Sequence, residues 1–443
     1  MKKLIIFFAV LALAGCDDDS SNNTTNNTTN NTTNNTTNNT TNNTTNNTTN
    51  NTTNNTNPDC SAPPRNFWNY DLTVMPPANV EIPATCRGED ENVLVYVADE
   101  AWDDEMVTPD MVENIITAWE ETTPGDSTAG IYTLVTETFG TPPDIDDDPR
   151  IIIFITPLGS YNGYTFDGYF KSENQSEGSY SNMTEMVYLD CEHHSPDSEY
   201  LLGVLAHEFQ HMISYGIDAM EDDWMDETMS QGAMFMTGYH SDLQYANSFL
   251  TTRHSTSPLI VSDVRNYDYG AGFLFAAYFI NRMGDTGFVN LAADEERGIT
   301  SLDSIISSEL GISFWEFMLD WSIASLVNDS SVESGKYNYP VIGESLSSIT
   351  TISGTRGEAV EKDMGIGTMF YAEYAVDGSP EFTITTSGDD LLLAAVYYGG
   401  DGSSPIVTIL DNTSTYTADG SDGSVVFVIL NTIQTGPVSF TAE

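Results

Sequence analysis

The stretch LAHEFQHMISYG, residues 205–216, sets two histidines four positions apart and places a glutamate directly after the first of them. Apolar residues surround the histidines at helical spacing, and the closing glycine is typical of a helix end. Residues four apart lie on one face of a helix, so His207 and His211 can present both imidazoles to one ion. Zinc accepts imidazole nitrogens at about 2.0 to 2.1 Å, and the stretch therefore predicts a zinc-binding helix.

Glu208, between these histidines, is the candidate for acid–base chemistry. A glutamate at this position can take a proton from a metal-activated water as a general base. In a chain with six histidines the five-residue pattern arises by chance about 0.006 times, so coincidence is a poor explanation. A lone histidine on a buried helix is usually a core residue, whereas two on one face favour a metal site.

A catalytic zinc site needs a third protein ligand and one open position. Glu227, in the segment WMDETMS, can return a carboxylate to the metal from a second helix. Spacing alone does not select Glu227, because several other acids and histidines compete for the role: Glu221, Asp222, Asp223, Asp226, His193, His194, His240 and His254.

These motifs resemble the metallopeptidases of the glutamate-zincin type, and most closely the hyicolysin family. The resemblance rests on VYLD ahead of the helix, on LAHEFQHMI and on WMDETMS, and it extends over residues 92–327. It implies that Glu227 is the third zinc ligand and that the reaction is cleavage within peptide chains. The chain departs from the family that it resembles at DET, residues 226–228, where members tend to have Asn-Glu-Gly; the carboxylate is kept but its neighbours differ.

A further role is implied by likeness to aminopeptidases of the same clan. They carry a tyrosine three residues before a glycine at the start of a helix, where it donates a hydrogen bond to the tetrahedral oxyanion. In NYDYGAGFLFAAY, residues 266–278, Tyr267 stands three positions before Gly270. We assign the role to Tyr267, with Tyr269 as its rival, and a tyrosine that merely packs at the helix entrance is the alternative.

The composition limits the partners of the chain. Its 443 residues include 66 acidic and 13 basic side chains, for a formal net charge of -53. So large an excess of negative charge repels nucleic acid and anionic lipid and attracts divalent cations. Nucleic acid is therefore excluded as a partner, and peptide or protein substrates are expected.

The N-terminal residues predict export and a lipid anchor. Residues 1–15 have the layout of a secretory signal, with two lysines before an apolar run too short to span a bilayer. LAGC resembles the lipobox of bacterial lipoproteins, which implies cleavage before Cys16 and a lipid on its thiol. Residues 16–58 are rich in Asn and Thr and are expected to form a disordered tether. We therefore expect a lipoprotein of the bacterial cell envelope, periplasmic or at the cell surface.

Lipidation of Cys16 leaves three cysteines in an oxidising compartment. Cys60 and Cys86 lie in one short, proline-rich segment, residues 59–91, which we expect to be irregular. Their closeness in the sequence favours a disulfide between them and leaves Cys191 as a free thiol.

The remaining pattern predicts an α+β fold. Extended segments are expected at 92–99, 150–159, 163–170 and 183–190, and a helix capped by Thr108 begins at Pro109. Helical segments follow the zinc-binding stretch, so residues 92–345 are expected to form a zincin-like domain, a mixed sheet followed by helices. About six short strands over residues 357–443 predict a C-terminal β-sandwich with an accessory role.

A second metal site is suggested by DIDDDPR, residues 144–150. Asp144, Asp146 and Asp148 place carboxylates at alternate positions before a strand, where their oxygens could bind calcium. The glycine that usually follows such acids is missing, and a solvated acidic turn is the alternative.

The sequence thus predicts a lipid-anchored zinc metalloendopeptidase. Metal-activated water attacks the peptide carbonyl while Glu208 takes its proton, and the segment 163–170 forms either an edge that pairs with the substrate or an ordinary hairpin. The alternative is a non-catalytic surface lipoprotein, an adhesion or binding module that holds a structural metal or none. Structural zinc sites are usually closed by four protein ligands, often cysteines, and Cys191 is the sole thiol near the motif, which disfavours that alternative.

Overall fold

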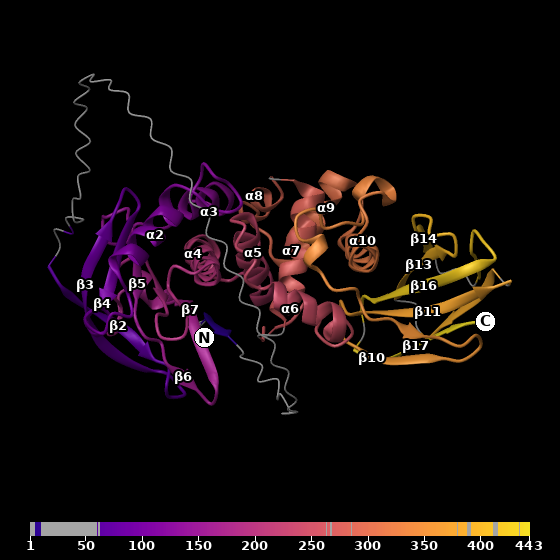
Figure 1. The fold of residues 1–443 in the computed structure, drawn as a ribbon, viewed down its shortest axis with the longest axis horizontal. Coiled ribbons are helices and arrows are strands. Elements are labelled where there is room, and N and C mark those ends of the chain that lie inside the picture. The colour runs from indigo at the N-terminus through magenta and orange to yellow at the C-terminus, as the bar shows by residue number, and fades with distance from the viewer. Residues whose placement is uncertain are drawn as a thin grey trace, which may run out of the picture.

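The computed structural model describes residues 5–9, 60, 63–262, 264–265, 268–284, 286–378, 380–387, 391–410, 415–433 and 435–443. A sheet with helices, a helical middle part and two further sheets follow one another along the long axis (Figure 1). The fold is a mixed α+β arrangement, compatible with the expected two-domain organisation. Cys16, Tyr267 and the whole expected tether lie outside the described residues.

An eight-stranded sheet forms the first part, in the order β1-β7-β8-β5-β4-β3-β2, with β6 paired to β7. Its strands are β1 (Ile5–Ala9), β2 (Arg65–Asp71), β3 (Ala78–Glu89), β4 (Val93–Ala98), β5 (Ile151–Ile155), β6 (Ser160–Tyr161), β7 (Tyr164–Phe170) and β8 (Met186–Leu189). The central strands β4, β5 and β8 run parallel and are buried along their whole length, which explains their unbroken apolar sequences. On one side β7 is antiparallel to β8, and β1 pairs with the outer edge of β7.

The expectation of an irregular segment at 59–91 is wrong. β2 and β3 form an antiparallel pair that extends the sheet beyond β4, and Phe67 on β2 is fully buried. The prolines concealed this pattern, because a proline usually interrupts a sheet. Pro83 is tolerated because it lies just beyond the part of β3 that pairs with β4. Cys60 and Cys86 form a disulfide with their Cα atoms 5.6 Å apart, and Cys191 is free and buried.

Ten α-helices lie in the described residues. They are α1 (Asp99–Asp103), α2 (Pro109–Glu120), α3 (Ile131–Phe139), α4 (Glu199–Asp218), α5 (Asp223–Met236), α6 (Leu243–Ser248), α7 (Tyr269–Met283), α8 (Gly287–Ala292), α9 (Gly298–Leu310) and α10 (Phe314–Val327). Short helical turns are η1 (Ser172–Gln175), η2 (Phe249–Arg253), η3 (Val332–Gly335) and η4 (Gly343–Ser345). As the sequence predicts, the Thr108 side chain caps α2 and Pro109 is its first residue.

Helix α4 contains the stretch LAHEFQHMISYG, residues 205–216, and lies in the middle of the fold. The Ser198 side chain accepts a hydrogen bond from the Leu201 amide and so caps the helix, and every residue from Leu201 to Ser214 is buried. One side of α4 packs on β7 and β8, and α5 packs along it, followed by α7 (Figure 1). The two histidines therefore lie inside the protein, between the sheet and the helical part.

Two sheets form the C-terminal part. Their orders are β10-β17-β12-β15 and β14-β13-β16-β11-β9. The strands are β9 (Ile352–Ser353), β10 (Val360–Met364), β11 (Met369–Asp377), β12 (Glu381–Thr386), β13 (Leu391–Gly399), β14 (Ile406–Leu410), β15 (Thr415–Thr417), β16 (Asp422–Asn431) and β17 (Gly436–Ala442). Phe382, Phe427 and Phe440 belong to a core of their own between the sheets. The opposite face of the larger sheet packs against α10, where the Tyr371 hydroxyl donates to the Ser322 carbonyl at 2.9 Å.

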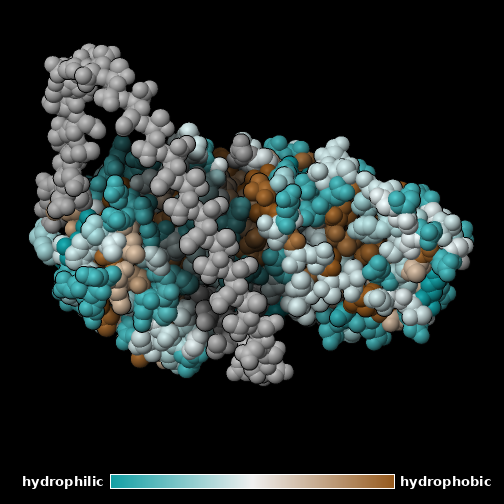
Figure 2. All heavy atoms as spheres, in the orientation of Figure 1, coloured by the Kyte–Doolittle hydropathy of each residue, from teal (hydrophilic) through white to brown (hydrophobic). Residues whose placement is uncertain are grey.

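The face drawn in Figure 2 is mostly hydrophilic, as the large excess of acidic residues requires, with smaller apolar areas between. Within the described residues no single helix has both the length and the apolar character needed to cross a bilayer; one pair, α9 with α10, bent by 79°, meets those criteria only jointly.

Candidate metal centre

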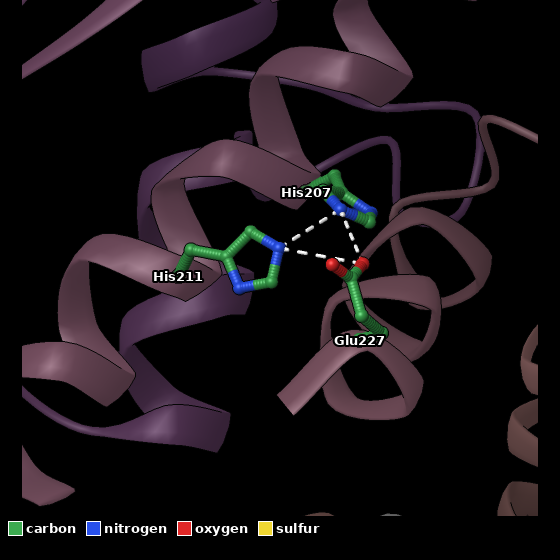
Figure 3. A group of neighbouring side chains, drawn as sticks. All are labelled: His207, His211 and Glu227. Atoms are coloured by element: carbon green, nitrogen blue, oxygen red, sulfur yellow. Dashed lines mark hydrogen bonds and ion pairs between the residues drawn. The ribbon is translucent and has the colours of Figure 1, made fainter. Parts of the chain in front are cut away.

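The side chains of His207 and His211 on α4 and of Glu227 on α5 point toward one another (Figure 3). The Nε2 atoms of the histidines are 3.0 Å apart, and Oε2 of Glu227 lies 3.3 Å from the first and 3.6 Å from the second. Ligand atoms of a tetrahedral zinc ion, each about 2.0 to 2.1 Å from the metal, lie about 3.3 Å from one another. The spacing of these three donor atoms fits a zinc ion.

The packing of α5 on α4 brings the carboxylate to the imidazoles. α5 starts at Asp223, shortly after α4 ends at Asp218, and runs back along it. Met225 and Met229, two residues to either side of Glu227, are buried in the main core and anchor this stretch of α5. A carboxylate on the second turn of α5 therefore faces the histidine side of α4.

The second ring nitrogens have partners of their own. Nδ1 of His211 lies 3.2 Å from Oδ2 of Asp226 and 3.1 Å from the Ser230 hydroxyl, and Nδ1 of His207 lies 3.5 Å from the Gln231 amide nitrogen. The Asp226 carboxylate can accept the Nδ1–H of His211, which orients that imidazole and leaves its Nε2 lone pair for a metal. The Gln231 amide nitrogen is itself a donor, so His207 would present its Nε2 lone pair only with the amide turned to place its oxygen at Nδ1. Asp226, a rival of Glu227 in the sequence, thus contacts the opposite nitrogen of His211.

The charges around the three groups favour a cation between them. Burial lowers the pKa of His211, but the carboxylates of Asp226 and Glu227 outweigh it and hold that pKa well above its usual value. Burial likewise raises the pKa of Glu227, yet the charge of His211 and hydrogen bonds from the imidazoles lower it to about 2. The centre is therefore arranged around positive charge, which a divalent metal also supplies.

Glu208 lies beside this group and is fully buried. Burial raises the pKa of its carboxyl to about 8, against the opposing effect of His211. Neither of its carboxylate oxygens has a hydrogen-bond partner of normal geometry among the described residues. Gly168 on β7 makes this close packing feasible, since a Cβ there would lie 2.7 Å from Val204 Cγ1 and 3.6 Å from Glu208 Cγ. At neutral pH most of this carboxyl is therefore protonated, and its ionised form is a strong base next to the candidate metal ligands.

Tyr269, the rival of Tyr267, lies at the start of α7 and is buried. The centroid of its ring is 6.0 Å from that of His207. Burial raises the pKa of its hydroxyl well above the usual value, and the charges of Glu227 and Glu208 raise it further. The hydroxyl therefore remains protonated and able to donate a hydrogen bond.

The other candidate ligands contact groups outside the centre. Nδ1 of His193 lies 3.1 Å from Oδ2 of Asp190, and Nε2 of His194 lies 3.8 Å from Oδ1 of Asp167. The ring of His240 stacks on that of Phe235, and Nδ1 of His254 lies 3.0 Å from the Met369 carbonyl oxygen. The Glu221 carboxylate accepts a hydrogen bond from the Gly298 amide at 3.0 Å. Asp222 and Asp223 are likewise not among the residues that converge with the histidines.

Sequence reasoning missed Ser230 and Gln231. They follow Glu227 by three and four positions, a spacing that places them on the same side of a helix, so the pattern was available. It also missed Asp242, a fully buried acid whose charge acts on His207 and whose own pKa burial raises to about 7. No local motif distinguishes Asp242 from the many other acids of the chain.

The predicted calcium ligands separate in the structure. Carboxylate oxygens of Asp144 and Asp146 come within 4.8 Å of each other and of a third acid, Glu185. Asp148 is not part of this group, because Arg150 binds its carboxylate at 2.6 Å. The alternating acids of the loop therefore include two of the three carboxylates that come together, Asp144 and Asp146, and the third is Glu185.

Comparison with known proteins gives one distant relative and little about the fold. No family model matches the chain. The chain is 24% identical over 225 residues to the neutral metalloprotease ShpI of Staphylococcus hyicus, which covers 43% of this chain and 49% of that protein. The chain thus spans about half the length of this relative. It is also similar over 21% of its length to the crystal structure of Salmonella Typhimurium PliG, a periplasmic inhibitor of g-type lysozyme, at 11% identity, 99% coverage of that chain and a TM-score of 0.16.

These findings indicate a distant similarity to a metalloprotease and, in the same chain, a group of side chains able to hold the metal that such an enzyme needs.

Proposed function

We propose that the protein is a zinc metalloendopeptidase of the HExxH type. The observation that carries the proposal is the convergence of His207 Nε2, His211 Nε2 and Glu227 Oε2 at 3.0 to 3.6 Å, with the carboxylate of Glu208 beside them. The distant similarity to a metalloprotease supports the same reaction. Proteins and peptides are the proposed substrates.

Zinc bound by His207, His211 and Glu227 would supply a Lewis acid that polarises a peptide carbonyl and lowers the pKa of water. Glu208 takes a proton from water as the water oxygen attacks the carbonyl carbon, and then delivers that proton to the departing amine nitrogen. The Tyr269 hydroxyl donates a hydrogen bond to the oxyanion that develops on the substrate. Asp226 and Ser230 hold the ring of His211 in place throughout.

The edge of β7 is the proposed binding site for the peptide backbone. β1 pairs with this edge antiparallel, from Ile5 opposite Phe170 to Ala9 opposite Thr165. An extended peptide can make the same backbone hydrogen bonds, with side chains pointing alternately to the two sides. If residues 1–15 are removed as a signal peptide, the edge becomes free for substrate.

The proposal includes the place where the enzyme works. A lipid on Cys16 and the Asn/Thr-rich residues 16–58 would hold the catalytic part away from a bacterial envelope membrane, on its periplasmic or outer side. Mass spectrometry of the mature N-terminus tests this part, and an N-terminus other than a diacylated or triacylated Cys16 would reject it.

Substitution Glu208→Gln tests the chemistry. It keeps the size of the side chain and removes its basicity, so each chain should retain one zinc ion while casein cleavage falls by at least about 10²-fold. Glu199→Gln is the matched control, because Glu199 is an exposed residue at the start of the same helix. Activity in the Glu208 variant equal to that of the parent would remove this residue from the mechanism. Absence of proteolysis in the zinc-loaded parent itself would favour a non-catalytic binding module.

A further inference from the structure

Three carboxylates meet at the edge of the N-terminal sheet where β5 and β8 begin. Asp144 and Asp146 lie in the loop before β5, Glu185 directly precedes β8, and their carboxylate oxygens lie within 4.8 Å of one another. β5 and β8 are parallel neighbours, and the Ile152 amide donates to the Glu185 carbonyl at 2.8 Å. The register of the sheet therefore fixes Glu185 beside the acidic loop.

Glu185 distinguishes this group from a solvated acidic turn. Its side chain is 1% exposed, and while one carboxylate oxygen accepts a hydrogen bond from the Ile145 amide, Oε2 is buried without a hydrogen-bond partner among the described residues. A buried carboxylate oxygen without a partner is costly, and two neighbouring negative charges increase the cost. Arg150 does not neutralise the group, since it binds Asp148 at 2.6 Å and Glu89 at 3.0 Å.

We propose that Asp144, Asp146 and Glu185 bind a calcium ion, at a site separate from the zinc centre and independent of the proposed protease activity. All three donors are carboxylate oxygens, which hard cations prefer, whereas zinc favours nitrogen and sulfur ligands. Calcium binds oxygens at about 2.3 to 2.6 Å, so two of its ligands lie at most about 5 Å apart, in agreement with the observed group. The exposed aspartates leave room for water to complete a shell of about six to eight ligands.

The calcium site would support the helix that carries the histidines. Pro143, directly before Asp144, packs against α4 at Gly216, where an added Cβ would lie 3.2 Å from Pro143 Cδ. A calcium ion that joins the loop to β8 would hold Pro143 in this contact. Calcium should therefore raise the thermal stability of the protein.

Calorimetric titration of calcium chloride into the full chain, with zinc kept saturating, tests the proposal. We expect one saturable calcium ion per chain, and affinity about tenfold weaker or worse in Glu185→Gln and in Asp146→Asn, since each loses one of three charged ligands. Asp147→Asn is the matched control: Asp147 is exposed in the same loop, and asparagine tolerates its φ of 65°. This control should bind calcium as the parent does.

Thermal unfolding provides a second measurement. Calcium should raise the melting temperature of the parent and of Asp147→Asn, and should do so far less in the Asp146 variant, whose change is at an exposed position. If Glu185→Gln fails to fold, Asp146→Asn still decides the result. The assignment would be overturned if calcium did not bind saturably or if Asp146→Asn bound it with the affinity of the parent. It would also be overturned if Asp147→Asn weakened binding equally, because that would indicate only a diffuse attraction of cations to the acidic chain.

Discussion

Replacement of Asp226 by asparagine tests whether the zinc centre depends on the carboxylate behind His211. Oδ2 of Asp226 lies 3.2 Å from Nδ1 of His211, whose Nε2 faces the other two metal-binding groups. Loss of such a partner usually weakens metal binding about 10- to 100-fold, which corresponds to about 1.4 to 2.8 kcal/mol. The Ser230 hydroxyl remains 3.1 Å from the same nitrogen, so we expect a loss near the lower end, about tenfold.

Competition with a chromogenic zinc chelator at fixed pH and ionic strength measures this effect. The kcat/KM of Asp226→Asn at saturating zinc should stay near that of the parent, because the three metal-binding side chains are unchanged. Asp223→Asn, which removes the same charge from the start of α5 outside the metal-binding group, should keep parental zinc affinity. Parental affinity in Asp226→Asn, or equal losses in both variants, would refute the role given to this carboxylate.

Three further changes have defined outcomes. Tyr269→Phe should lower kcat of peptide hydrolysis about 10²- to 10³-fold with zinc content unchanged, because it removes one donor to the oxyanion; steady-state kinetics with an unchanged kcat would exclude that role. Gly168→Ala should destabilise the fold by about 1 to 3 kcal/mol in urea unfolding, since the added Cβ would lie 2.7 Å from Val204 Cγ1, and stability equal to the parent would show that β7 can move away. Burial raises the pKa of Asp167 in the folded protein to about 7 from its ordinary value of 3.8, so the folded state holds this proton more tightly than the unfolded state. The free energy of unfolding should therefore fall as pH rises between these values, by at most about 1.4 kcal/mol per pH unit from this group, and Asp167→Asn should reduce that slope. Identical slopes in parent and variant would contradict the assignment.

The local sequence was sufficient to predict those features that lie within a single helix or strand. Two histidines four residues apart must share a face once the segment is helical, so the pairing of His207 with His211 followed from spacing alone. The cap at Thr108, the unbroken apolar runs of β4 and β5 and the alternating strands after residue 357 are local in the same sense. The proline-rich segment was the exception, because its prolines suggested a loop while Phe67 and its neighbours pack into the sheet.

Only the tertiary structure decided which carboxylates meet which partners. Asp226 and Glu227 are adjacent in the sequence, but about 100° separates successive side chains around a helix, and the packing of α5 on α4 turns one toward Nδ1 and the other toward Nε2. Glu185 joins Asp144 and Asp146 only because β8 lies beside β5 in the sheet. Spacing fixes neighbours within one helix, whereas contacts between elements depend on how their apolar faces pack, and no short stretch of sequence contains that information.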